Sequence, residues 1–281
     1  MVQDPLISAD WLVANIEHSD VRVLDATWVP PFLKDRPTGK ACFADGHILG
    51  AEYFDIDQIA DRETTLSHML PSASVFAEKV GGLGVSNDTH VIVYDSNGFF
   101  ASARAWWMFR AMGHTQVQVL DGGLEAWRQA GGKVDTGTTQ AAQPAVFNAT
   151  LASDLVRDIS AMRRHVAKGD VKILDARDQG RFNGTSPEPR ASLASGHMPG
   201  SFCVPASVLL TDEKKMKPAA DLSPLLSNFV DSPVITSCGS GVSAAVIALA
   251  LARLGNWDAA LYDGSWSEWA AHPDNPIATT P

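Results

Sequence analysis

The sequence has few cysteines and few basic side chains. Its 281 residues include three cysteines, Cys42, Cys203 and Cys238, an odd and sparse set that argues against a disulfide framework and favours a reducing cytoplasm. Lys and Arg total 22 against 32 Asp and Glu, so the formal net charge is −10. This balance argues against nucleic acid or an anionic membrane as a partner, because both bind clustered positive charge. An anionic substrate would need a local basic pocket.

Long apolar runs are also missing. The longest, residues 244–252, is too short to cross a bilayer. The first six residues have neither a basic region nor an apolar core, so we expect no signal peptide. A hydrophobic content of 45% and a charged content of 19% are typical of a globular protein. The length predicts two domains of ordinary size.

Four blocks of the first half recur, in the same order, in the second half. The pairs are 21–26 with 171–176, 46–50 with 196–200, 91–95 with 234–238, and 121–127 with 263–269. Ordered blocks with nearly constant spacing indicate a tandem duplication. We therefore predict a first domain over residues 1–135, a linker over 136–150 and a second domain over 151–281. The linker is placed there because residues 131–144 are rich in Gly, Thr, Gln and Ala and lack a clear apolar period.

Each half alternates strand-like and helix-like segments. Strands are expected at 21–26, 91–95 and 117–120, and helices at 102–112 and 244–254, each helix being followed by a glycine. The strands are apolar on both faces, which suits a parallel sheet covered by helices. The expected fold class is therefore α/β, with a mostly parallel sheet flanked by helices in each domain.

Cys238 lies where a predicted strand meets a glycine-rich loop. The apolar run that ends at this residue is followed by Gly239 and Gly241, and then by the Ala-rich helix. Backbone N–H groups of such a loop and the positive end of the helix dipole favour thiolate over thiol. Cys238 is thus a candidate nucleophile, whereas Cys42 and Cys203 are interpreted as packing residues. The first half has Asp95 at the equivalent position, so only the second half is expected to be catalytic.

These motifs resemble the rhodanese-like sulfurtransferases over essentially the whole chain. The resemblance rests on the repeated Asp-Ala and Gly-His blocks, on the Asp-Gly…Trp endings, and on the segments 181–185 and 187–190. It implies tandem rhodanese-like domains. The loop from Cys238 to Ser243 is similar to that of the members that use 3-mercaptopyruvate, whereas thiosulfate-using members carry basic residues directly after the cysteine.

The resemblance also implies roles for individual residues. Arg181 and Arg190 would bind the carboxylate and carbonyl of 3-mercaptopyruvate, in keeping with the bidentate geometry of guanidinium and carboxylate. Both arginines are expected on a loop that is punctuated by Gly and Pro and precedes the catalytic strand. Asp57 and His68 would act with Ser240 as a proton relay across the domain cleft. The remaining substrate-binding candidates are loop residues: Gly239, Gly241, Val242 and Ser243.

The implied reaction moves sulfur from 3-mercaptopyruvate through a Cys238 persulfide to an acceptor, with release of pyruvate. The acceptor would be a thiol such as thioredoxin or a low-molecular-weight thiol, or cyanide. This chemistry needs no bound cofactor, and the sequence has no recognisable metal-binding motif.

Three alternatives remain at this level. A thiosulfate:cyanide sulfurtransferase would favour more positive charge at the loop than Gly239 and Ser240 offer. A rhodanese-like phosphatase would want an arginine six positions after the cysteine, where this chain has Ala244. A non-catalytic binding module would be expected to lack the cysteine.

Overall fold

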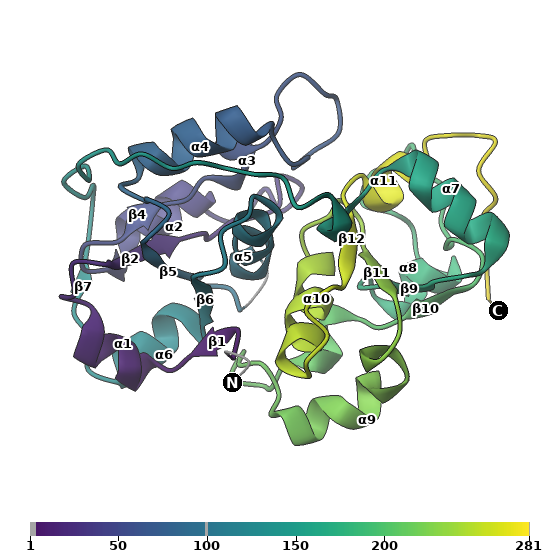
Figure 1. Cartoon of the computed structure of the whole chain (residues 1–281). Helices are drawn as coiled ribbons and strands as arrows, with labels where there is room; N and C mark the ends of the chain where they lie inside the picture. The colour runs from purple at the N-terminus through teal and green to yellow at the C-terminus, as the bar shows by residue number, and fades with distance from the viewer. Residues whose placement is uncertain (1–3, 99–100, 281) are drawn as a thin grey trace. The chain divides into compact units, whose positions relative to one another are not determined.

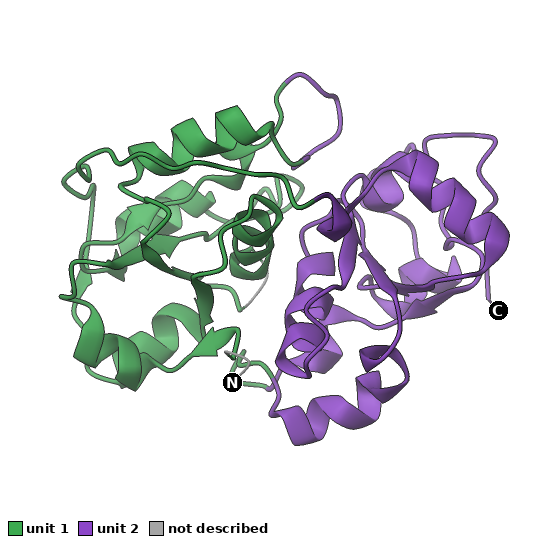
Figure 2. Ribbon diagram, in the orientation of Figure 1, with its two compact units in different colours: residues 1–62, 70–152, 212–216 green, residues 63–69, 153–211, 217–281 purple. Residues whose placement is uncertain are grey.

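The computed structural model describes residues 4–98 and 101–280, and the chain divides into two compact units. Unit 1 comprises residues 1–62, 70–152 and 212–216, and unit 2 comprises residues 63–69, 153–211 and 217–281 (Figure 2). Residues 63–69 therefore belong to unit 2 although they lie in the first half of the sequence.

A five-stranded parallel sheet forms the centre of unit 1, and helices flank it (Figure 1). In spatial order the strands are β1 (Leu6–Ile7), β6 (Val117–Leu120), β5 (His90–Tyr94), β2 (Val21–Asp25) and β4 (Glu52–Tyr53). The helices are α1 (Ala9–Asn15), α2 (Gly39–Asp45), α3 (Ile56–Ile59), α4 (Ala73–Gly82), α5 (Ser102–Ala111) and α6 (Gly123–Gln129). A separate antiparallel pair joins β3 (His47–Ile48) to β7 (Val134–Asp135).

Unit 2 repeats this architecture. Its parallel strands, in spatial order, are β8 (Val156–Arg157), β12 (Ala260–Tyr262), β11 (Val234–Ser237), β9 (Lys172–Asp175) and β10 (Ser201–Cys203). The helices are α7 (Ile159–Lys168), α8 (Gln179–Asn183), α9 (Ala219–Val230), α10 (Ala244–Arg253) and α11 (Ser265–Trp269), with short 3-10 turns at Ser153–Leu155 and Ala206–Leu209.

The two sheets have the same strand order, which confirms the predicted duplication. β5 lies between β2 and β6 in unit 1, and β11 lies between β9 and β12 in unit 2. The α/β fold class is confirmed as well, because every strand pair of the two main sheets is parallel and helices flank both. Ser237 is paired with Asp175 at the ends of β11 and β9, so the segments that follow these strands begin at the same edge.

Glycines end the two helices that follow the central strands. α5 is followed by Gly113 at φ 85°, and α10 by Gly255 at φ 104°. A side chain is rarely tolerated at such a positive φ, so these glycines allow the chain to turn after the last helical turn. Both helices are buried along nearly their whole length.

The predicted linker runs over unit 1 without regular structure. Residues 136–150, all of which are described, form no helix or strand. The Ala145 N–H donates to the Gly81 carbonyl at 2.9 Å, and Phe147 is buried beside Phe76 and Phe109. Among residues 4–98 and 101–280, no helix has the length and apolarity needed to cross a membrane.

Candidate active site

Cys238 is the first residue after β11, at the carboxyl edge of the unit 2 sheet. This edge is where parallel α/β sheets bind their ligands. The loop turns at Gly241, whose φ is 80°, and leads into α10. The Cys238 side chain is shielded from bulk solvent, with a relative exposure of 2%. Electrostatic interactions of a charged sulfur are strengthened by such burial.

The backbone of the cysteine loop offers several unused hydrogen-bond donors. Within the described residues, the N–H groups of Gly239, Ser240, Val242 and Ser243 donate no hydrogen bond. Ser243 precedes α10 and makes no side-chain cap, so the positive end of the helix dipole adjoins the same loop. The loop therefore has the donors that an anion at the sulfur would require.

The equivalent loop of unit 1 holds an anion from its own chain. Asp95 occupies the position of Cys238 and is 2% exposed. One oxygen of its carboxylate accepts hydrogen bonds from the Ala101 and Ser102 N–H groups at 3.2 and 2.8 Å, and the other accepts from Asn97 N–H at 3.1 Å. A loop of this kind thus binds negative charge at the position where unit 2 places a sulfur.

The first turn of α11 holds the cysteine loop through hydrogen bonds to the backbone of Cys238. The Cys238 N–H donates to the Ser265 hydroxyl at 3.1 Å, and the Trp266 N–H donates to the Cys238 carbonyl at 2.9 Å. Ser265 has a φ of 50°, which is unusual for a residue with a side chain. Its hydroxyl donates in turn to the Tyr262 carbonyl at 2.9 Å. The cysteine backbone is therefore held in a single position.

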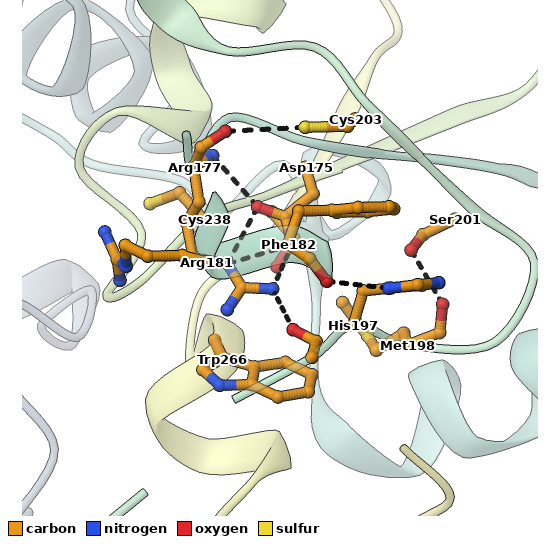
Figure 3. A network of polar contacts seen from close by, with 12 residues as sticks. Asp175, Arg177, Arg181, Phe182, His197, Met198, Ser201, Cys203, Cys238 and Trp266 are labelled. Carbon is orange, nitrogen blue, oxygen red and sulfur yellow. Dashed lines mark hydrogen bonds and ion pairs between the residues drawn. The ribbon is translucent and has the colours of Figure 1, made fainter. Parts of the chain in front are cut away.

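Arg181 lies against the cysteine loop. We expected it on a loop; the structure corrects this, because Arg181 is part of α8, which is capped by the Asp178 carboxylate. A Cβ added at Gly239 would lie 3.0 Å from Nη2 of Arg181, so the guanidinium touches the residue next to Cys238 (Figure 3). Glu188 accepts from Nε and Nη2 of Arg181 at 3.2 and 2.6 Å.

A buried ion-pair network extends from this arginine into the domain (Figure 3). Arg177 donates to Glu188 at 2.8 Å and to both carboxylate oxygens of Asp175, and its guanidinium lies 4.3 Å from the centroid of a Trp266 ring. Burial by itself lowers the pKa of Arg177, but the Asp175 and Glu188 carboxylates outweigh burial and raise the pKa. Arg177 therefore remains a cation that holds two buried carboxylates.

Arg190 is tied to the same loop through a serine. Its Nη1 donates to the Ser267 hydroxyl at 3.0 Å, and both the hydroxyl and the N–H of Ser267 donate to the Gly239 carbonyl. Its Nη2 donates to the Ser67 hydroxyl at 3.3 Å, and Ser67 belongs to the segment 63–69 of unit 2. Both predicted substrate-binding arginines are thus connected to Gly239.

The three residues of the predicted proton relay do not all belong to one unit. His68 belongs to unit 2, as Cys238 and Ser240 do, and it is 6% exposed with a φ of 65°. Asp57 belongs to unit 1, in α3, where its carboxylate accepts from Trp28 Nε1 at 2.8 Å. The relay from Asp57 through His68 to Ser240 stays a prediction.

The other two cysteines have surroundings that disfavour a thiolate. Burial and the negative charge of Asp175 raise the pKa of the Cys203 thiol to about 11. Burial, with Asp25 and Asp45, also raises the pKa of Cys42. All three cysteines are free thiols. Because the thiolate is the nucleophile, Cys42 and Cys203 are poor candidates for sulfur chemistry.

Four residues that shape the site were given no role from the sequence: Arg177, Glu188, Ser265 and Ser267. The repeat itself carries a signal for three of them. Where unit 2 has Arg177, Ser265 and Ser267, the equivalent positions of unit 1 are Thr27, Gly123 and Glu125. A difference within or directly after a shared block is therefore the signal that points to these three residues.

Comparison with known proteins identifies the family. The model of the rhodanese-like domain matches residues 8–130 and 158–272. The chain is 38% identical over 274 residues to 3-mercaptopyruvate sulfurtransferase of Escherichia coli (strain K12), covering 96% of each chain. It is 41% identical over 273 residues to thiosulfate sulfurtransferase of Gallus gallus, covering 94% of this chain and 92% of the relative.

A solved structure agrees with these relatives. The crystal structure of SseA from Escherichia coli, a 3-mercaptopyruvate sulfotransferase with the rhodanese fold, superimposes with a TM-score of 0.84 at 36% identity and covers 94% of this chain and 99% of that one. The chain belongs to the rhodanese family and contains two rhodanese-like domains.

Proposed function

We propose that this protein is a 3-mercaptopyruvate sulfurtransferase in which Cys238 carries the transferred sulfur. The observation that carries the proposal is the connection of two guanidinium groups, Arg181 and Arg190, to the residue that follows this cysteine. A 2-keto acid presents a carboxylate and a carbonyl, and two guanidinium groups can bind both. The site thereby has a local positive charge, which the acidic chain lacks overall.

The first half-reaction breaks the carbon–sulfur bond of the substrate. The Cys238 thiolate attacks the sulfur of 3-mercaptopyruvate and forms a sulfur–sulfur bond. The electron pair of the broken bond passes to the carbon as the enolate of pyruvate, which is then protonated. Four N–H groups of the loop donate no hydrogen bond within the described residues, and they stabilise the charge on Cys238 before attack: those of Gly239, Ser240, Val242 and Ser243. Arg181 and Arg190 hold the substrate in an orientation for attack.

In this proposal Ser240 transfers the protons, and His68 and Asp57 complete the relay. The persulfide proton is delivered to the enolate carbon, which completes pyruvate. In the second half-reaction an acceptor thiolate attacks the outer sulfur, and the Cys238 thiolate leaves. A small thiol or a reduced thioredoxin supplies that acceptor, and a reducing compartment such as the cytoplasm keeps the three free cysteines reduced.

Thiosulfate is the second candidate donor, because the chain is 41% identical to a relative named thiosulfate sulfurtransferase. The side chains of Gly239 and Ser240 add no positive charge for a dianion, which supports the keto acid as the main donor.

The decisive experiment compares both donors with the purified protein. We expect pyruvate release from 3-mercaptopyruvate with a thiol acceptor, at a higher kcat/KM than thiocyanate formation from thiosulfate and cyanide. Without an acceptor, the peptide that contains Cys238 should gain the mass of one sulfur atom. Absence of pyruvate, or sulfur found on another cysteine, would overturn the proposal.

Replacing Arg190 by glutamine should raise the KM for 3-mercaptopyruvate by about 10- to 100-fold, because a hydrogen bond to a charged group is lost. Ser267 donates both of its hydrogen bonds to Gly239 without help from Arg190, so the loop should keep its support. The matched control is Arg164→Gln, at an exposed position on α7, which should leave KM unchanged. Steady-state assays of pyruvate release measure both, and an unchanged KM in Arg190→Gln would remove Arg190 from substrate binding.

A further inference from the structure

Glu188 places a buried negative charge beside one of the two substrate-binding arginines. Its side chain is 3% exposed and lies between Arg177 and Arg181, which it contacts at 2.8 and 2.6 Å. Apart from the exposed Asp178, the network contains two carboxylates, Asp175 and Glu188, and two guanidinium groups. Its formal charge is therefore zero, although Arg181 faces the cysteine loop.

Arg190 has different surroundings. Its two hydrogen-bond partners are the neutral hydroxyl groups of Ser67 and Ser267. Across residues 4–98 and 101–280, no carboxylate oxygen lies within 4.0 Å of its guanidinium. Arg190 therefore keeps its full positive charge, whereas the charge of Arg181 is compensated by Glu188.

We propose that Glu188 determines donor selectivity by neutralising Arg181, so that the unit 2 site presents one net positive charge to a donor. This inference rests on the proposed function, because it assumes that Arg181 and Arg190 both face the donor. 3-Mercaptopyruvate with a neutral thiol is a monoanion, and thiosulfate is a dianion. The Glu188 carboxylate repels the second negative charge of thiosulfate at short range in a shielded setting, where Coulomb interactions are strong. Glu188 thus sets selectivity for the keto acid without touching the donor, by acting through Arg181.

The test is the ratio of kcat/KM for thiosulfate to kcat/KM for 3-mercaptopyruvate. In Glu188→Gln, which keeps the shape of the side chain and removes its charge, this ratio should rise by about 10-fold over the wild type. The matched control is Asp178→Asn. Asp178 is a carboxylate 4.0 Å from Nε of the same arginine, but it is 61% exposed, and asparagine also caps helices. Solvent screens this charge, so the ratio should change by no more than about twofold.

A second variant tests the inference even if Glu188→Gln fails to fold. Arg181→Gln leaves Glu188 bonded to Arg177, so the buried carboxylate keeps a partner. The charge of Glu188 is then uncompensated toward the loop, and the ratio should fall by about 10-fold. The double variant Arg181→Gln with Glu188→Gln should bring the ratio back near the wild-type value, even though both donors are used less well.

Two outcomes would overturn the inference. One is an unchanged ratio in Glu188→Gln or in Arg181→Gln. The other is an equal change in Asp178→Asn, which would indicate a general charge effect. These outcomes are separate from failure of the proposed function, which is judged by pyruvate release in the wild type. The ratio can still be measured if the wild type turns out to prefer thiosulfate.

Discussion

Replacing Cys238 by serine should reduce sulfur transfer by roughly 1,000-fold or more, because a hydroxyl cannot accept and pass on a sulfur atom. The fold should survive, since a serine side chain fits where the thiol lies and the backbone hydrogen bonds to Ser265 and Trp266 do not involve the side chain. Turnover with 3-mercaptopyruvate and circular dichroism together measure the two effects. Residual activity within about tenfold of the wild type would show that another group carries the sulfur.

Cys203→Ser and Cys42→Ser are the matched controls. Both side chains carry thiols whose pKa is raised, mainly by burial, so neither is expected to contribute and both variants should keep wild-type turnover. Alkylation at neutral pH provides an independent check. We expect turnover to fall in proportion to the modification of Cys238, because this residue carries the transferred sulfur in the proposed reaction.

The sequence predicts the framework of this protein well because local chemistry determines it. Residues 117–120 were predicted as a strand and form β6, and the helix predicted at 102–112 forms α5 one residue shorter. Gly113 and Gly255 mark the helix ends, since positive φ is favourable mainly for glycine. The duplication was readable for the same reason, because each half repeats these local signals.

Side-chain partners could not be predicted in the same way. Arg181 was expected on a loop, yet Asp178 caps a short helix there. Glu188 was visible in its motif, but its position between Arg177 and Arg181 depends on contacts made after the chain folds. Ser267 reaches Arg190 from 77 residues away. Such distant pairs have no local periodicity, so only the folded chain reveals them.

Replacing Arg177 by methionine should destabilise unit 2 by about 3–5 kcal/mol at neutral pH, because removing one partner leaves buried charges uncompensated. Methionine is of similar length and apolar, so the loss of charge pairing is the main change. The side chains of Asp175 and Glu188 would remain in the interior, with exposures of 0% and 3%, as carboxylates that have lost this cation. Urea unfolding measures the effect. The control is the triple variant with Asp175→Asn and Glu188→Gln, which removes the carboxylates too and should regain much of the loss.

Unit 1 shows how a buried carboxylate behaves without such an arginine. Asp25 occupies the position of Asp175, and Thr27 that of Arg177; burial raises the pKa of Asp25 to about 6. The folded state then binds more protons than the unfolded chain between about pH 4 and 6, so Asp25 costs stability as pH rises through that window. The Arg177→Met variant should acquire the same dependence in unit 2. Its deficit relative to the wild type should be smaller at pH 5 than at pH 8, because protonation removes the unpaired charge. An equal deficit at both pH values would mean that Arg177 stabilises unit 2 by packing on Trp266 rather than by charge.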